Sequence, residues 1–408
     1  MEPQASTLSA AKRRTIYLLC FLAIIIDGFD TTTIAYVAPR LSAVWQLARG
    51  EIAPAFIATS IGAVIGYLLS GWAAARLGKR KLIAWSIFVF GVLTIATAYV
   101  GTLTELTAIR LFTAIALGFV VPAAISSAAD HSDDRTRAAV TIFVTTGLSL
   151  GAAAGGFLAA FLMVRFDWQS VFITGGVLAF CLVPFVWQSL ATDGLESETA
   201  KTANGGLAAL FKEGQASSTI LIWALAFVSF MVTYLFMFWV PTLLTLFKFS
   251  PSQAPLGSGA FGLGGVLGNL VILPFVKRYG PERLVIATSL LCIVCLYALA
   301  IGALQPMLVL VAIAGVGAGL VSACVSQSTL SVLRFRADLR TSAVGAAAAV
   351  GRIGSIVGPA IGGMLVASKL SPEMIMVVSS VPVVGIILIL IGLLAVARPA
   401  LPLSRQAG

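Results

Sequence analysis

The chain has 408 residues, of which 59% are hydrophobic and only 10% are charged, and its mean hydropathy is +1.03. A soluble domain of this length does not have such a composition, so the sequence indicates an integral membrane protein. The net charge of +10 does not indicate a nucleic-acid partner, because most lysines and arginines fall on one side of the predicted membrane.

Twelve apolar runs of about 20 residues follow one another along the chain, and each can cross about 30 Å of hydrocarbon as a helix. They are residues 15–37, 52–74, 82–101, 104–127, 138–163, 170–190, 219–243, 256–276, 284–303, 306–330, 343–367 and 374–397. We therefore expect an all-α integral membrane protein with twelve transmembrane helices in a lipid bilayer.

The lysines and arginines predict the orientation of these helices. With the N-terminus inside, 19 of them fall in cytoplasmic segments and five in external loops. The excess of positive charge inside predicts a multi-pass protein of a bacterial-type inner membrane with both termini in the cytoplasm. The first apolar run is too long and too polar in its middle for a cleaved signal peptide, so we expect it to be retained.

The first span carries two carboxylates, Asp27 and Asp30, about 60° apart around a helix and therefore able to face one cavity. Charged side chains are costly inside a bilayer, which makes both functional candidates. Two carboxylates on adjacent turns repel each other, and burial disfavours their charged forms, so we expect at least one to exchange a proton near neutral pH. Asp30 lies nearer the depth of Arg110 and is its expected ion partner, which leaves Asp27 as the expected proton carrier.

Two arginines lie within spans, Arg110 in the fourth and Arg352 in the eleventh, both near the depth of the two aspartates. They can balance the carboxylates, and a guanidinium can also hold a substrate carboxylate bidentately. A purely structural salt bridge is the alternative. The seventh span offers apolar walls at residues 230–239, where Tyr234 can hydrogen-bond a ring substituent and Trp239 is expected in an interfacial aromatic belt.

Two stretches repeat between the halves of the chain. ARLGKRKL at 75–82 matches KRYGPERL at 277–284, and four glycines of the fifth span match four of the eleventh at a separation of 207 positions. The polar interval 191–218 lies between them. We therefore predict an N-terminal six-helix half at 1–190, a cytoplasmic linker at 191–218 and a C-terminal six-helix half at 219–408. The glycine stripes, with six further glycines at 257–268, favour moving helix interfaces over static packing.

Several motifs together carry a resemblance. DGFD at 27–30, RLFTAIALGFVVP at 110–122, DWQSVF at 167–172 and AVGRIGSIVGPAIGG at 349–363 occur in the order typical of the aromatic acid/proton symporters of the major facilitator superfamily. The resemblance covers nearly the whole chain. It implies that superfamily's fold and proton-coupled uptake of a small aromatic acid anion, such as a hydroxybenzoate, by alternating access.

The resemblance also implies a gating loop at the cytoplasmic face, with Arg76, Gly78, Arg80 and Asp130. This sequence departs from the family pattern at Ala75, where an acidic residue normally stands, so its charge latch is altered. Asp130 holds the place of the acidic residue expected at the end of the fourth span.

A proton-coupled drug or organic solute antiporter of the same superfamily is the alternative function, although buried arginines favour an anionic substrate. An enzyme is not expected, because the spans contain no histidine and no metal-ligand spacing. The five cysteines all fall in apolar spans and predict neither disulfides nor a metal site. We expect no cofactor and a monomer, and the sequence does not distinguish one aromatic acid from another.

Overall fold

The computed structural model describes residues 10–133, 136–189, 210–211, 215–301, 304–335, 339–368 and 370–396. Within these ranges, twelve helices are long and apolar enough to cross a membrane, which confirms the twelve predicted spans. The first six are α1 (Ala10–Val44), α2 (Ala53–Leu77), α3 (Lys79–Thr97), α4 (Leu103–Asp130), α5 (Arg137–Arg165) and α6 (Gln169–Ser189). They are followed by α7 (Ala216–Leu246), α8 (Pro255–Ile272), η3 (Leu273–Phe275), α9 (Val276–Tyr279), α10 (Pro281–Ala300), α11 (Pro306–Arg334), α12 (Arg340–Ala367) and α13 (Pro372–Ala395).

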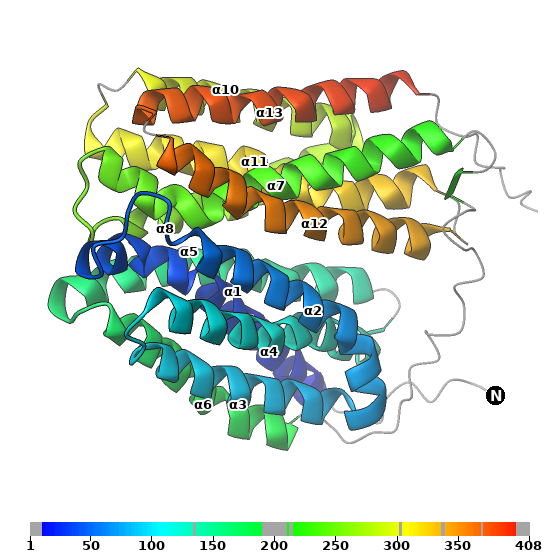
Figure 1. Ribbon diagram of the computed structural model, residues 1–408. Helices are drawn as coiled ribbons and strands as arrows, with labels where there is room; N and C mark the ends of the chain where they lie inside the picture. The colour runs from blue at the N-terminus through cyan, green and yellow to red at the C-terminus, as the bar shows by residue number, and fades with distance from the viewer. Residues whose placement is uncertain are drawn as a thin grey trace, which may run out of the picture.

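The helices form two bundles, the N half (α1–α6) and the C half (α7–α13), which lie side by side (Figure 1). In the N half, α1 packs against α5, α2 against α4 and α3 against α6. The corresponding pairs of the C half are α7 with α12, α8 with α11 and α10 with α13. The same pairing in both bundles confirms the two six-helix halves of the predicted fold.

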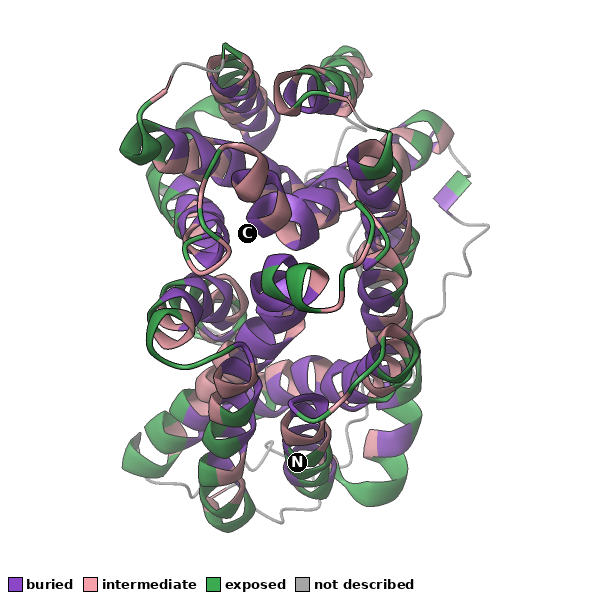
Figure 2. Cartoon of the chain, turned by 60° about the vertical axis from the view of Figure 1, so that its left-hand side comes forward, coloured by how far each residue is buried: buried purple, intermediate pink, exposed green. Residues whose placement is uncertain are grey.

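The two bundles share the same two ends. We call the end at which α1 begins and α13 ends the termini end, and the opposite end, with the turn between α1 and α2, the far end (Figure 1). Figure 2 shows that buried faces turn toward the inside of the bundles and exposed faces outward. Large apolar side chains such as Leu68 and Tyr99 are 74% and 77% exposed, as expected of surfaces that contact lipid.

Local chemistry explains several helix ends. The Thr102 side chain accepts a 3.2 Å hydrogen bond from the Glu105 backbone N–H, and Glu105 in turn accepts one of 2.9 Å from the Gly101 N–H. The first bond satisfies an N–H group that α4 leaves free at its start, and the second holds the residue that precedes the N-cap. The predicted span 256–276 is broken near its end, where Pro274 falls within the short η3 segment between α8 and α9 because proline cannot continue an α-helical hydrogen-bond ladder.

The matched loops have the same backbone shape. Gly78, between α2 and α3, has φ 76° and ψ 148°, and Gly280, between α9 and α10, has φ 78° and ψ 152°. Only glycine adopts this region without strain. The predicted equivalence of the two loops is therefore confirmed at the level of single dihedral angles.

Most glycines of the two repeated stripes lie inside the halves, which corrects the expectation of moving interfaces for these two stripes. A Cβ at Gly147 or Gly151 would collide with the backbone of α1, and one at Gly354 or Gly358 with that of α7. These glycines let paired helices of one half pack closely. Other described glycines meet the other half, with Gly156 against Gly259 on α8, Gly262 of α8 against Ala153 on α5, and Gly363 against Ala53 on α2.

Most of the predicted linker 191–218 lies outside the described residues, and α7 begins at Ala216. The linker therefore stays a prediction. The five cysteines are free thiols.

Candidate functional site

A buried cavity lies between the two halves. Its volume is about 20 Å³, room for about one water molecule, so it must widen before it can hold an aromatic acid. Helices α1, α2, α4 and α5 line it from the N half, and α7 and α12 from the C half. The lining residues are Asp27, Thr31, Thr59, Ser60, Ala63, Tyr67, Gly118, Leu148, Tyr234, Met237, Phe238 and Arg352.

Arg352 brings a positive charge to this cavity from the C half. Its guanidinium carbon lies 3.9 Å from the centroid of the Tyr67 ring on α2 and 5.9 Å from that of the Phe230 ring on α7. The Arg352 Nη1 donates a 3.4 Å hydrogen bond to the Tyr234 hydroxyl. In the described part of the chain, no carboxylate forms an ion pair with Arg352. The guanidinium is thus held by aromatic rings and the Tyr234 hydroxyl, and its other N–H groups can bind an incoming carboxylate.

Asp27 supplies the carboxylate of the cavity. It is only 6% exposed and lines the cavity together with Arg352. Among the described residues, no hydrogen bond or ion pair joins the Asp27 side chain to another group. A carboxylate without a fixed partner, beside a free guanidinium, can exchange protons through the cavity.

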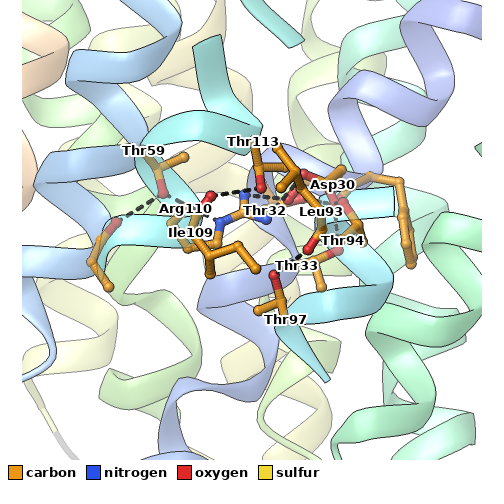
Figure 3. Close-up of polar contacts among 12 residues, drawn as sticks. Asp30, Thr32, Thr33, Thr59, Leu93, Thr94, Thr97, Ile109, Arg110 and Thr113 are labelled. Carbon is orange, nitrogen blue, oxygen red and sulfur yellow. Dashed lines mark hydrogen bonds and ion pairs between the residues drawn. The ribbon is translucent and has the colours of Figure 1, made fainter. Parts of the chain in front are cut away.

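Asp30 and Arg110 form a separate buried ion pair within the N half (Figure 3). The Arg110 Nη1 donates to the Asp30 carboxylate at 3.1 Å, and Nη2 donates to the Asp30 backbone carbonyl at 3.0 Å. The Thr94 hydroxyl donates to the other carboxylate oxygen at 2.7 Å, and the Arg110 Nε donates to the Thr59 hydroxyl at 3.5 Å. The side chains of Arg110 and Asp30 are 0% and 1% exposed, so this network is fully enclosed by protein.

The structure therefore divides the predicted site residues into two groups. Asp27, Arg352 and Tyr234 line the cavity, whereas Asp30 and Arg110 do not. The predicted ion pair between Asp30 and Arg110 is confirmed. The expectation that both aspartates face one cavity is wrong in this structure, because Asp30 turns toward α3 and α4. Substrate binding by Arg110 stays a prediction that this geometry does not support.

Three aromatic side chains close the halves against each other at the far-end side of the cavity. The Phe56 ring of α2 stacks on Phe238 of α7 with centroids 5.0 Å apart, and it meets the Trp239 ring edge-on at 5.0 Å. The Trp239 Nε1 donates a 2.9 Å hydrogen bond to the Pro359 carbonyl. All three rings are fully buried, and we call them the far-end seal. The expected place of Trp239 in a membrane-interface belt is therefore wrong.

The predicted gating-loop residues lie at the termini end and contact the N half. Lys79 forms an ion pair with Asp130 at the end of α4. The Arg76 guanidinium lies 4.6 Å from the Trp72 ring centroid, and that of Arg80 lies 5.3 Å from that of Trp187. Gly78 provides the turn between α2 and α3, and Ala75 is exposed. These contacts all stay within the N half, so they do not close the termini end here.

Sequence reasoning missed the contribution of α2 to the cavity. Ser60, Ala63 and Tyr67 follow one another at helical spacings of three and four residues, which places them on one face. That spacing is visible in the sequence, but it does not reveal which face of an apolar helix meets the other half. Phe56 was missed for the same reason.

Comparisons with known proteins agree with this architecture. The sequence model of the family described as the Major Facilitator Superfamily matches residues 20–359 and 222–408. The chain is 29% identical over 406 residues to a gallate transporter of Pseudomonas putida, covering 91% of this chain and 90% of that protein. It is 28% identical over 405 residues to the 4-hydroxybenzoate transporter PcaK of Acinetobacter baylyi, covering 90% of this chain and 88% of that protein.

A solved structure shares the fold. A bacterial homologue of the human lysosomal transporter Spinster, in an inward-facing and occupied conformation, matches with a TM-score of 0.73. The match covers 94% of this chain and 97% of that one at 17% sequence identity, so it bears on the fold alone.

Proposed function

This chain belongs to the major facilitator superfamily, and we propose that it takes up a small aromatic carboxylate together with protons by alternating access. The observation that carries this proposal is the free guanidinium of Arg352, stacked on Tyr67 in a cavity between the halves. A planar guanidinium among aromatic rings suits a planar carboxylate attached to an aromatic ring. The similarity to transporters named for gallate and 4-hydroxybenzoate supports the same substrate class.

Proton coupling on this proposal follows from charge balance between Asp27 and Arg352. In the empty cavity, a charged Asp27 balances the charged Arg352. When a substrate carboxylate binds to Arg352, a second charged carboxylate nearby is unfavourable in a site that excludes water. Protonation of Asp27 removes that repulsion, so substrate and proton bind together. Asp30 contributes by holding the Arg110 charge within the N half.

Orientation and organisation complete the proposal. We infer from the positive charges that the termini end faces the cytoplasm of a bacterial-type inner membrane, with residues 191–218 as a cytoplasmic linker between halves 1–190 and 219–408. Alternating access then requires the far-end seal to open while the gating loop at Arg76, Gly78, Arg80 and Asp130 closes. A monomer suffices on this proposal, because both halves that line the cavity belong to one chain.

The test is uptake of labelled benzoate, hydroxybenzoates and gallate into cells that express the protein. We expect saturable uptake of at least one acid, and its collapse when a protonophore removes the proton gradient. Arg352→Lys should raise the KM for uptake more than about tenfold, whereas Arg340→Lys, on the same helix but outside the cavity, should not. Saturable uptake of none of the acids refutes the substrate class, and uptake that survives the protonophore refutes the coupling.

A further inference from the structure

Ser60 on α2 has a hydroxyl group that finds no partner among the residues that the structure describes. The residue is 2% exposed, its Oγ is shielded from solvent, and no described group forms a hydrogen bond with it. Serine and threonine hydroxyls in helices usually donate to a carbonyl on the preceding turn. On the same helix, Thr59 donates to Ala55 at 2.8 Å and Ser70 donates to Tyr67 at 2.7 Å. Ser60 thus departs from the behaviour of its neighbours.

Ser60 lies where a ligand in the cavity can reach its hydroxyl group. It lines the cavity that contains Arg352, where two other hydroxyl groups are already engaged. The Thr59 hydroxyl is bound to Ala55 and Arg110, and the Tyr234 hydroxyl accepts from Arg352. A buried hydroxyl without a partner is unfavourable, and this cost is relieved when a partner arrives.

The geometry of α2 indicates where a hydrogen-bond partner of Ser60 would lie. Arg352 stacks on the Tyr67 ring, and Ser60 lies on the same face seven residues earlier, about 10 Å away along the helix axis. Ala63 lies between them and adds only a methyl group to the wall. A molecule whose carboxylate binds to Arg352 therefore extends its ring along Ala63 toward Ser60.

We propose that Ser60 selects aromatic acids that carry a ring hydroxyl on the side away from the carboxylate, by forming a hydrogen bond with that hydroxyl. This inference rests on the proposed function and adds a specificity-determining residue to it. An ortho hydroxyl stays beside Arg352 and does not reach Ser60. A meta or para hydroxyl points toward it. The Ser60 oxygen both donates and accepts, so it can pair with a phenol in either direction.

The experiment uses proteoliposomes with an imposed proton gradient and follows the uptake of a labelled aromatic acid that the protein transports. It compares how strongly unlabelled benzoate, 2-hydroxybenzoate, 3-hydroxybenzoate and 4-hydroxybenzoate compete with that uptake. We expect the parent protein to prefer the 3- or 4-hydroxy acid over benzoate and 2-hydroxybenzoate. Ser60→Ala should weaken binding of the preferred acid roughly fivefold, the effect of one neutral hydrogen bond, and leave benzoate unchanged. Ser60→Cys keeps the approximate size of the side chain and should lose the same preference.

The matched control is Ser289→Ala on α10. Ser289 is 1% exposed and also has no hydrogen-bond partner in the described part of the chain, but it does not line the cavity, so its variant should behave like the parent. If Ser60→Ala weakens all four acids equally, or none of them, Ser60 only packs or binds water and the inference is overturned. If the parent transports benzoate and the hydroxybenzoates without preference, the inference also fails while the proposed function stands. If no aromatic acid is transported or competes, the proposed function itself fails.

Discussion

The buried pair of Asp30 and Arg110 leads to a prediction that separates a structural role from substrate binding. Arg110→Gln removes the guanidinium that donates to the Asp30 carboxylate and carbonyl, and it leaves Asp30 charged with Thr94 as its remaining donor. Removing one partner of a buried ion pair costs about 3–5 kcal/mol. The Asp30→Asn change should cost less, because Arg110 keeps its bond to the Asp30 backbone carbonyl and its contact with Thr59.

The double variant Asp30→Asn with Arg110→Gln removes both charges and places two amides side by side. It should therefore recover most of the stability lost in Arg110→Gln, with a coupling free energy of at least about 1 kcal/mol between the two sites. The assay is thermal unfolding in detergent, together with the amount of protein in the membrane. Substrate exchange by the double variant should persist, because neither residue lines the cavity.

Two results would refute this reasoning. If Arg110→Gln is as stable as the parent, the pair is not a structural element of the N half. If the double variant is stable but binds no aromatic acid, Arg110 contacts the substrate in a state that this structure does not represent.

Three further predictions concern the cavity and the far-end seal. Arg352→Lys keeps the charge but loses the planar fork and its stacking on Tyr67, so the KM for uptake should rise more than about tenfold, and an unchanged KM would exclude a bidentate contact. Asp27→Asn should abolish accumulation against a gradient but retain counterflow, with Asp133→Asn as the exposed control, and normal accumulation would rule out Asp27 as the proton carrier. Phe56→Ala opens a gap in the far-end seal and lowers the stability of this packing by about 3–5 kcal/mol. A cysteine introduced as Ala53→Cys should therefore be labelled faster from the far end. The matched control is Phe90→Ala, an equally buried ring inside the N half, and equal labelling of both variants would show general loosening instead.

The number and type of helices could be predicted because hydrocarbon offers the backbone no hydrogen-bond partners outside its own helix. An apolar run of about 20 residues must satisfy its own hydrogen bonds, and this makes it a helix whatever its neighbours are. The repeat could also be predicted, since Gly78 and Gly280 need a backbone conformation that only glycine adopts easily. These features depend on local chemistry that the sequence displays directly.

The sequence does not predict which charged residues line the cavity and which are enclosed within one half, because this depends on which helix faces meet. Arg110 and Arg352 are both single arginines in apolar spans at similar depths, yet one is enclosed by α1 and α2 and the other lines the cavity. Arg334 shows the same limit. It is one of the 19 basic residues that the sequence assigns to the cytoplasmic side, but it is 3% exposed and donates to Glu282 at 3.0 Å and to the Val396 carbonyl at 3.0 Å.

The placement of Ser60, Phe56 and Tyr67 on one rigid helix connects recognition with movement. A substrate bound to Arg352 of the C half and to Ser60 of the N half makes both contacts only at one separation of the halves. A ligand shifts a conformational equilibrium only by the difference between its affinities for the two states, and such a bridging contact supplies that difference. Phe56 lies one turn beyond Ser60 on α2, so a movement of α2 that adjusts the cavity also displaces the far-end seal. On this proposal, a substrate that lacks the distal hydroxyl should bind through Arg352 but favour less the separation of the halves at which both contacts form. Its maximal transport rate should therefore differ from that of a hydroxylated acid even at saturation.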